Sequence, residues 1–416
     1  MTLDGRRILY ISYNGMLEPL GQSQVIPYLQ ALSHLGTRFT LLSFERANAF
    51  TPQGAELADA LSRKLAEHKI EWHSLRYHKT PSLPATGFDV IHGIRKAEQL
   101  VQKNAIEIVH ARNHIPAMIA LRMKQRFGVK MIFDVRGLMA DEYVDAKHWR
   151  KNSVAYRITK SLERKALAAA DGVVTLTEKI WPIISESDGL HDRDIVHEVV
   201  PCCADLERFK FSAAERSRLR QELGIEGRLV VVYSGSIDGW YLTEEMAEFF
   251  VVLGKHNPAA YFLWLTTTKH ERIRKLMKDR AVSESDYQVL SATPGEMPSY
   301  LSASDVGLAF IKACFSKLAS SPTKYAEYLG CGLPLIINAG IGDSDALIID
   351  DRAGVLVENF TETGYREAAI AIELLVAEAE KTRARAREVA ERRFDVNAVG
   401  ARRYARMYEK LLAAAN

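Results

Sequence analysis

The chain of 416 residues is too long for one compact hydrophobic core, so we expect two domains. Its hydrophobic content of 47% and charged content of 26% are typical of a soluble globular enzyme, and its formal net charge of +3 is too small to indicate nucleic-acid binding. The N-terminus lacks a signal-peptide apolar region, and no apolar stretch approaches the roughly 20 residues that cross a bilayer. We therefore expect a cytoplasmic protein. Cysteines 202, 203, 314 and 331 lack the spacing of metal ligands, so we expect no metal site.

Short β-branched segments alternate with longer helical segments, which is typical of βαβ units on a parallel sheet. In the first half we expect strands at Arg7–Ser12, Phe39–Phe44, Ile70–Arg76, Ile106–His110, Lys130–Phe133, Gly172–Leu176 and Ile195–Val200. The pattern restarts with strands at Arg228–Tyr233, Tyr261–Leu265, Tyr287–Leu290, Val306–Phe310, Leu333–Ile337 and Gly354–Val357. Helices are expected between them, for example at Gln22–Leu35, Gly54–His68, Pro116–Phe127 and Tyr156–Ala170.

Two successive sets of units predict an α/β protein with two doubly wound, Rossmann-like domains that face a cleft between them. We place the first domain at residues 1–205 and the second at 206–390. Residues 391–416 continue a long charged helical segment with no strand after it, and we expect this helix to cross back to the first domain.

Ligands of doubly wound sheets bind at the carboxyl ends of the strands, so the loops there are the candidates for binding. After the first strand, Gly21 permits a tight turn, and the expected helix begins at Gln22 and Ser23, whose N–H groups would meet a phosphate or an acceptor. Asn14 lies earlier in the same loop. The loop has neither the Gly-x-Gly-x-x-Gly spacing nor a Walker lysine, so an ordinary strand-to-helix turn is an equal alternative.

Charged residues also follow two later strands of the first half. Asp134, Arg136, Asp141 and Glu142 follow one strand, and Arg136 has the fork geometry that pairs with phosphate or carboxylate. Asp141 or Glu142 would orient an acceptor hydroxyl or act as its base. The alternative is an internal Arg–Asp ion pair that braces the loop. Candidate acceptor residues after another strand are His110 and Arg112, although a single histidine in such a place is more often structural.

The segment Lys147–Lys165 holds seven lysines and arginines against one acid, Glu163, with apolar and aromatic residues between them. Such a helical segment can lie on an anionic membrane surface, which would bring the protein to the inner face of the membrane. A solvated helix packed through its apolar stripe is a slightly better alternative.

In the second half, Ser234, Gly235 and Ser236 end a strand and suit the close approach of an anionic or sugar ligand, with an ordinary turn as the alternative. The run Ser320-Ser321-Pro322-Thr323 is typical of a capped helix start. Lys324 follows in the first turn, where the helix dipole disfavours a cation unless an anion binds beside it. We therefore expect a diphosphate there, with Glu327 accepting hydrogen bonds from a ribose. The alternative is a solvent-facing lysine on an ordinary helix.

These residues resemble family 4 of the retaining GT-B glycosyltransferases over nearly the whole chain. The similarity lies in the Gly21 loop, the segment Val200–Phe209, Ser234-Gly235-Ser236, the stretch from Ser320 through Glu327 to Pro334, and the ending from Arg393 to Tyr408. The resemblance implies transfer of a sugar from a nucleoside-diphosphate sugar with retention and without a metal. It implies an acceptor-binding first domain and a donor-binding second domain.

The resemblance also assigns roles to individual residues. Glu327 would contact the donor ribose. The diphosphate would be held by Ser321–Lys324 and Ser234–Ser236, and Arg136 falls where many members have a cleft histidine that contacts the sugar. Two departures stand out: Ala319 replaces a glutamate that contacts the sugar, and the Ser236–Trp240 loop lacks the usual arginine and lysine. We expect Lys312, Lys317 and Lys324 to replace those cations and stabilise the leaving diphosphate.

The sequence therefore predicts a glycosyltransferase whose donor is a UDP- or GDP-sugar and whose acceptor is a glycan or a lipid-linked glycan, in cell-surface polysaccharide synthesis. Two alternatives remain open. One is a nucleotide-sugar epimerase of the same architecture. The other is a nucleotide-sugar-binding homologue without activity.

Overall fold

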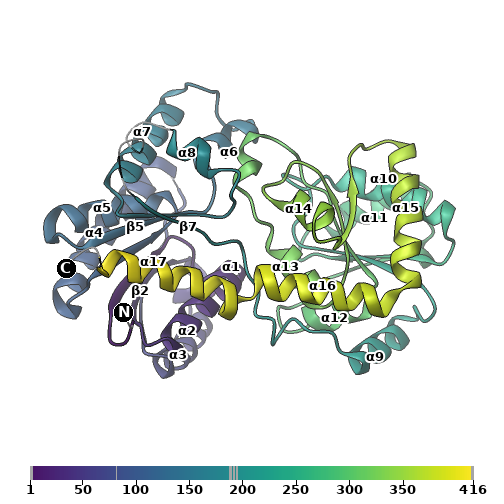
Figure 1. Cartoon of the computed structure of the whole chain (residues 1–416), viewed down its shortest axis with the longest axis horizontal. Coiled ribbons are helices and arrows are strands. Elements are labelled where there is room, and N and C mark those ends of the chain that lie inside the picture. The colour runs from purple at the N-terminus through teal and green to yellow at the C-terminus, as the bar shows by residue number, and fades with distance from the viewer. Residues whose placement is uncertain (1–2, 81, 187–189, 191–192, 194, 414–416) are drawn as a thin grey trace. The chain divides into compact units, whose positions relative to one another are not determined.

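The computed structural model describes residues 3–80, 82–186, 190, 193 and 195–413. The chain divides into two compact units, each with its own parallel sheet (Figure 1). The first unit combines Met1–Pro201 with Val396–Asn416, and the second spans Cys202–Asp395. Among the described residues, no helix is both long and apolar enough to span a bilayer.

The sheet of the first unit has seven parallel strands in the order β3-β2-β1-β4-β5-β6-β7. These strands are β1 (Arg7–Ser12), β2 (Arg38–Glu45), β3 (Ile70–Arg76), β4 (Ile108–Arg112), β5 (Lys130–Val135), β6 (Gly172–Thr175) and β7 (Val196–Val199). Its central strands are buried on both faces because helices cover both faces. The predicted α/β class and the predicted strands of this half are confirmed, each within two residues.

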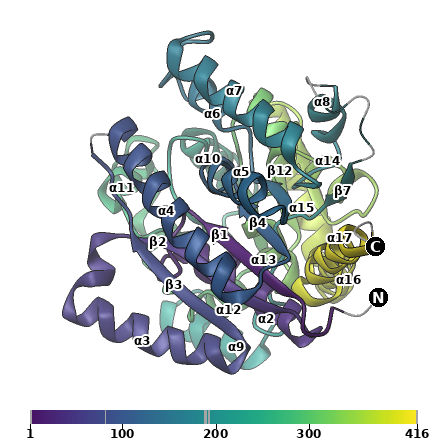
Figure 2. The same ribbon diagram turned by 90° about the vertical axis from the view of Figure 1, so that its left-hand side faces the viewer.

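Helices of the first unit pack on both faces of this sheet. They are α1 (Pro19–Gln24), α2 (Ile26–His34), α3 (Pro52–Glu67), α4 (Ser82–Asn104), α5 (His114–Phe127), α6 (Met139–Asp145), α7 (Val154–Ala169), α8 (Trp181–Ser185) and α17 (Arg402–Ala413), with a 3₁₀ turn η1 (Ala47–Phe50). Helices α4 and α7 both pack against α5, which lies on strands β4 and β5 (Figure 2). The expected single helix Gln22–Leu35 is wrong in detail, because the chain breaks at Val25 into α1 and α2.

The sheet of the second unit has six parallel strands in the order β10-β9-β8-β11-β12-β13, which confirms the second predicted set. They are β8 (Leu229–Ser234), β9 (Ala260–Leu265), β10 (Tyr287–Leu290), β11 (Val306–Ala309), β12 (Leu335–Asn338) and β13 (Gly354–Val357). The helices are α9 (Ala213–Leu223), α10 (Thr243–His256), α11 (His270–Asp279), α12 (Met297–Ala303), α13 (Thr323–Gly330), α14 (Ser344–Ile349), α15 (Glu362–Ala377) and α16 (Ala379–Phe394), with 3₁₀ turns η2 (Glu284–Asp286) and η3 (Phe315–Ala319).

The C-terminal segment changes unit at residue 396. Helix α16 packs on α13 in the second unit, and a π-helical turn η4 (Val396–Ala401) then leads into α17, which packs on β7 and η4 in the first unit. In Figure 1 this is the yellow segment. The last element of the chain therefore completes the core of the first unit.

Candidate functional site

The candidate site of the second unit is formed by the segments that follow β8 and β11. The N–H of Leu242 donates to the carbonyl of Phe310 at 3.0 Å, and the N–H of Lys312 donates to the carbonyl of Trp240 at 2.8 Å. Tyr241 and Ile311 also form an antiparallel bridge. These backbone bonds hold the Ser234–Tyr241 loop against the Ile311–Thr323 segment, so the two predicted donor loops lie together.

Lys324 is the central residue of this site. Its side chain is buried, and its Nζ lies 3.7 Å from the ring centroid of Tyr241 and 4.2 Å from that of Tyr233. Among the groups that the structure describes, this Nζ has no hydrogen-bond partner. Burial lowers the pKa of Lys324 well below its ordinary value, although Glu327 opposes this effect. The structure therefore contradicts the alternative of a solvent-facing lysine.

Gly235 brings the β8 loop close to this amine. Its φ of +127° is one that residues with a side chain rarely adopt, and a Cβ built there would lie 3.1 Å from Lys324 Nζ. The preceding Ser234 is fixed, because its N–H donates to the Tyr328 hydroxyl at 2.7 Å and its Oγ lies 3.0 Å from the same oxygen. A side chain at position 235 would be strained by this backbone conformation and would press against the lysine amine.

The start of α13 differs from the predicted capped start. The cap position is Pro322, and no side chain caps the helix. The Ser321 hydroxyl instead accepts from the N–H of Cys202 at 3.1 Å. The prediction of a serine cap is therefore wrong. The N–H of Tyr325 donates to the Pro322 carbonyl at 3.0 Å, so the N–H groups that this helix start leaves for an anion are those of Thr323 and Lys324. Ser320, Ser321, Pro322 and Thr323 are half-buried.

Glu327 lies one turn after Thr323 and is half-buried. Burial raises the pKa of its carboxyl to about 7, while Arg208 and Lys324 act in the opposite direction. The carboxyl is therefore uncharged in a fraction of molecules at neutral pH and is able to donate as well as accept a hydrogen bond.

The remaining predicted cations lie in the same region. Lys317 is buried with its Nζ 4.0 Å from the ring centroid of Trp240, and Lys312 is half-buried next to the bridge at Ile311. Ala319, in the position of the missing glutamate, is buried. The loop residue Asp238 pairs with Lys269 and Arg272, each at 3.0 Å, so cations from beyond β9 reach this loop.

Sequence reasoning missed the aromatic residues that contact the lysines, which are Tyr233 and Tyr241 at Lys324 and Trp240 at Lys317. Tyr233 and Tyr241 stand at the two ends of the candidate loop in the sequence, and this pair of aromatic residues was the signal from which a cation contact could have been predicted. Their contact with Lys324 depends on the pairing of two loops about 80 residues apart, which no local pattern reveals.

In the first unit, His110 and Asp134 lie on the α17 face of the sheet and are fully buried. His110 Nδ1 lies 2.8 Å from the Tyr408 hydroxyl, and the Tyr404 hydroxyl donates to Asp134 Oδ2 at 2.8 Å. Burial raises the pKa of Asp134, but Arg136 and then His110 outweigh it and hold it at about 2. These contacts fit a structural role for His110 and Asp134, which bind α17, better than a role in acceptor binding.

Arg136 and Arg112 belong to the same cluster. Arg136 NH1 lies 3.7 Å from Asp134 Oδ1, which is the internal ion pair that the alternative reading predicted. Its guanidinium also donates to the Tyr404 hydroxyl at 3.4 Å and to Gln24 Oε1 at 3.5 Å. Arg112 is buried. These contacts give Arg136 a structural part in holding α17.

Asp141 and Glu142 lie in the first turn of α6, a helix that the sequence analysis did not expect. Acidic residues are favourable at a helix start, which explains their position without a catalytic role. Asp141 accepts from the Tyr156 hydroxyl at 3.1 Å and from Lys160 Nζ at 3.3 Å, so it is bound to α7.

The expected phosphate turn after β1 is also different. Helix α1 already begins at Pro19, and the N–H of Gln22 donates to the carbonyl of Glu18 at 3.0 Å. Gln22 Nε2 donates to the Met16 carbonyl at 2.6 Å, and Gly21 packs directly against Gly15 and Met16. The prediction that Gln22 opens a helix is wrong, and its N–H is not available to a phosphate.

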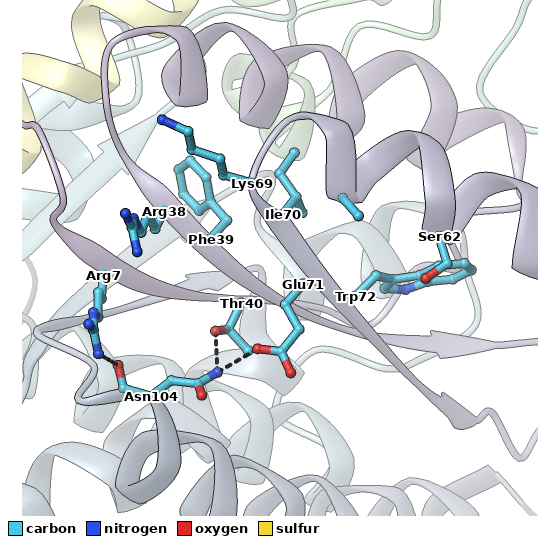
Figure 3. A pocket seen from close by; sticks show the side chains of 11 residues that line it. Arg7, Arg38, Phe39, Thr40, Ser62, Lys69, Ile70, Glu71, Trp72 and Asn104 are labelled. Atoms are coloured by element: carbon cyan, nitrogen blue, oxygen red, sulfur yellow. Dashed lines mark hydrogen bonds between the residues drawn. The ribbon is translucent and has the colours of Figure 1, made fainter.

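Among the described residues of the first unit, two of the cavities are similar in volume. One, of about 670 Å³, lies at the carboxyl ends of the strands and includes Asn14 in its lining. The other, of about 610 Å³, lies at the amino ends of β1 to β3, where Asn104 bonds Thr40 and Glu71 and accepts from Arg7 (Figure 3). Ligands of such sheets bind at the carboxyl ends, which favours the first cavity. Within the described ranges, no cluster of three histidine, cysteine or acidic side chains would hold a metal ion.

Comparison with known proteins agrees with this architecture. Residues 27–196 match the Glycosyl transferase 4-like domain, so the first unit contains a domain of that kind. No curated protein matches the sequence.

Three solved structures share the fold of this chain over nearly its whole length. Sucrose-phosphate synthase from Thermosynechococcus elongatus is 16% identical with a TM-score of 0.73, covering 98% of this chain and 100% of that one. HepE from Anabaena, solved with UDP-glucose, is 15% identical with a TM-score of 0.68, covering 98% and 99%. WaaG, a glycosyltransferase involved in lipopolysaccharide biosynthesis, is 14% identical with a TM-score of 0.68, covering 96% and 98%. The chain has the GT-B fold.

Proposed function

We propose that this GT-B protein with its glycosyl transferase 4-like domain is a retaining glycosyltransferase that moves a sugar from a nucleoside-diphosphate sugar to a glycan or lipid-linked glycan. The observation that carries the proposal is the buried amine of Lys324 beside Gly235 and the start of α13, which has no hydrogen-bond partner among the residues that the structure describes. A buried amine without a partner is costly to the fold, and an anion bound beside it would remove that cost.

The chemistry of sugar transfer uses this arrangement. As the bond between the anomeric carbon and the diphosphate breaks, negative charge grows on the leaving diphosphate. Lys324, supported by Lys317 and the first N–H groups of α13, stabilises that charge. Binding of the diphosphate favours the protonated amine and so reverses the effect of burial on the pKa of Lys324. We assign the contact with the donor ribose to Glu327.

We place donor binding in the second unit and acceptor binding in the first, with action in cell-surface polysaccharide synthesis at the cytoplasmic face of the membrane. The fold of HepE, solved with UDP-glucose, supports UDP-sugars as the first donors to test. The membrane contact is supported by the exposed apolar side chains of Val154 and Ile158, which lie next to exposed Arg157 on α7.

The test is a screen of UDP- and GDP-sugars in which release of the nucleoside diphosphate is measured, followed by NMR of the released or transferred sugar. We expect release from one donor, with the product keeping the anomeric configuration of that donor. Appearance of an epimeric nucleotide sugar would identify the epimerase alternative instead. Binding of a donor without any release would identify an inactive homologue. Exposed Lys278 on α11 offers a matched lysine control for variants of Lys324.

A further inference from the structure

The pairing of β8 with β11 in the second sheet stops before the carboxyl ends of these strands. The last register pair that joins them is Val232 with Gly307, whereas β8 stays paired with β9 as far as Ser234 and β11 stays paired with β12 as far as Ala309. The strand order also reverses between β8 and β11, which is where doubly wound sheets bind their ligands. Among the described strands, the end of β8 therefore has no register partner on its β11 side.

The Tyr328 hydroxyl occupies the place of that missing partner. The N–H of Gly235 donates to the Leu265 carbonyl on the β9 side at 2.9 Å, and successive N–H groups of an extended chain point to opposite sides. The N–H of Ser234 therefore faces β11, and it donates to the Tyr328 hydroxyl at 2.7 Å. Tyr328 comes from α13 and is fully buried. Its hydroxyl thus pairs a buried backbone donor that would be costly to leave unpaired.

Gly307 on β11 makes room for this tyrosine. A Cβ built on Gly307 would overlap the ring of Tyr328, so a side chain there would displace the ring. The glycine of β11 and the tyrosine of α13 fit together, and their packing sets the position from which the hydroxyl reaches Ser234.

The hydroxyls of Tyr328 and Ser234 share their protons in one order. Ser234 Oγ lies 3.0 Å from the Tyr328 hydroxyl oxygen. Burial raises the pKa of the Tyr328 hydroxyl above its ordinary value, against the effect of its bonds to Ser234, so the phenol keeps its proton. If Ser234 donated to Tyr328, that phenol proton would have no acceptor within the described part of the chain, and a buried donor without an acceptor is costly. Tyr328 therefore donates to Ser234, which leaves the Ser234 proton for a ligand.

A second tyrosine holds the other end of the same short loop. The Tyr233 hydroxyl donates to the Ser236 carbonyl. Between these two anchors lies Gly235, where a Cβ would be 3.1 Å from Lys324 Nζ. The Ser234 hydroxyl thus belongs to the residue that precedes the close approach of the loop to the lysine amine.

We propose that Tyr328 is a positioning residue of the donor site, whose hydroxyl holds the backbone of Ser234 and orients the Ser234 hydroxyl to donate to the diphosphate of the nucleotide. The inference rests on the proposed function and deepens it, because it names a residue that sets the affinity for the nucleotide through a neighbour. Both bonds of the Tyr328 hydroxyl go to Ser234, so its effect on the ligand passes through that residue.

Tyr328→Phe removes the hydroxyl and keeps the ring over Gly307. Tyr261→Phe is the matched control, because Tyr261 is a buried residue of β9 in the same sheet whose hydroxyl donates to Gln288 Oε1 at 3.3 Å. Each variant loses one hydroxyl bond, so a purely structural loss would affect both in the same way. Ser234→Ala, alone and combined with Tyr328→Phe, completes a double-mutant cycle.

The experiment titrates UDP and GDP into the wild type, and then titrates the tighter-binding nucleotide into the four variants, whose melting temperatures are also measured. We expect Tyr328→Phe to bind the nucleotide about tenfold more weakly than the wild type, and Tyr261→Phe to bind it as the wild type does. We expect Ser234→Ala to weaken binding as well. In the Ser234→Ala background, Tyr328→Phe should weaken binding by less than about threefold, because the hydroxyl that it orients is gone.

Three results would overturn the inference. The first is unchanged nucleotide affinity in Tyr328→Phe, with or without a lower melting temperature, which would leave Tyr328 a structural residue. The second is an equal loss of affinity in Tyr261→Phe. The third is an effect of Tyr328→Phe that has the same size with and without the Ser234 hydroxyl.

The wild-type titration separates these results from failure of the proposed function. A wild type that binds neither UDP nor GDP contradicts the donor site itself and, with it, the inference. A wild type that binds one of them while Tyr328→Phe binds it equally well keeps the donor site and removes only the role of Tyr328.

Discussion

At the residue scale, Lys324 is a group whose position is costly for folding. Its buried Nζ has no hydrogen-bond partner among the described residues, and it is compensated by the faces of Tyr233 and Tyr241 and by the charge of Glu327. We predict that Lys324→Met lowers sugar transfer roughly 10²–10³-fold, because it removes a stabiliser of transition-state charge. The same change should raise stability by about 1–2 kcal/mol, since methionine fills the site without burying an amine.

The loss of transfer is measured by the turnover of Lys324→Met and Lys278→Met, and the gain of stability is measured by their thermal unfolding. Lys278 is exposed, so its variant should behave as the wild type. A structural lysine would give the opposite stability result, because its loss would lower the melting temperature. Activity of Lys324→Met near that of the wild type would remove the residue from catalysis.

Glu327 makes the stability of the protein depend on pH, because burial raises the pKa of its carboxyl. Its pKa is raised in the folded protein to about 7 from an ordinary value of 4.5, so the folded state binds more protons than the unfolded state in that interval. Its contribution to stability is therefore present below 4.5 and is lost as the pH rises through about 7. We predict that Glu327→Gln gains stability relative to the wild type over this interval, by an amount on the order of 3 kcal/mol. Denaturant unfolding at several pH values tests this, and parallel curves would show that Glu327 is not titrating there.

At the scale of elements, α17 is bound to the first unit through polar contacts in its core. The Tyr404 hydroxyl donates to the buried carboxylate of Asp134, whose other contacts are His110 and Arg136. We predict that Tyr404→Phe destabilises the protein by about 1–3 kcal/mol, since it removes a donor from a buried charge. Tyr143→Phe is the control, because Tyr143 is exposed. Equal melting temperatures for both variants would contradict a role for this contact in holding α17.

The elements also show what the sequence is able to predict. Strands such as β8 and β12 are continuous apolar, β-branched segments, and their local pattern is enough to place them within two residues. The start of α13 was placed correctly, but its cap was not, because Ser321 finds a tertiary partner in Cys202. Helix α6 was missed because it is only seven residues long. Long-range pairing decides such details, and a single sequence does not reveal it.

At the scale of the whole molecule, each unit contributes a different kind of site. The second unit presents a backbone loop, a helix start and buried lysines, which suit a diphosphate. The first unit presents a cavity of about 670 Å³ whose lining is mostly apolar and aromatic. The burial of Asp134 and His110 shows why the first unit was harder to interpret, because charged residues that follow strands were taken as ligand contacts when they hold α17.

The most direct test of the account is a crystal structure of the protein with UDP. We predict density for the two phosphates within hydrogen-bonding distance of Lys324 Nζ, next to Gly235 and the first N–H groups of α13, with the ribose at Glu327. Density for UDP at another place, or a Lys324 amine that remains enclosed by its two tyrosines while UDP is bound, would contradict it.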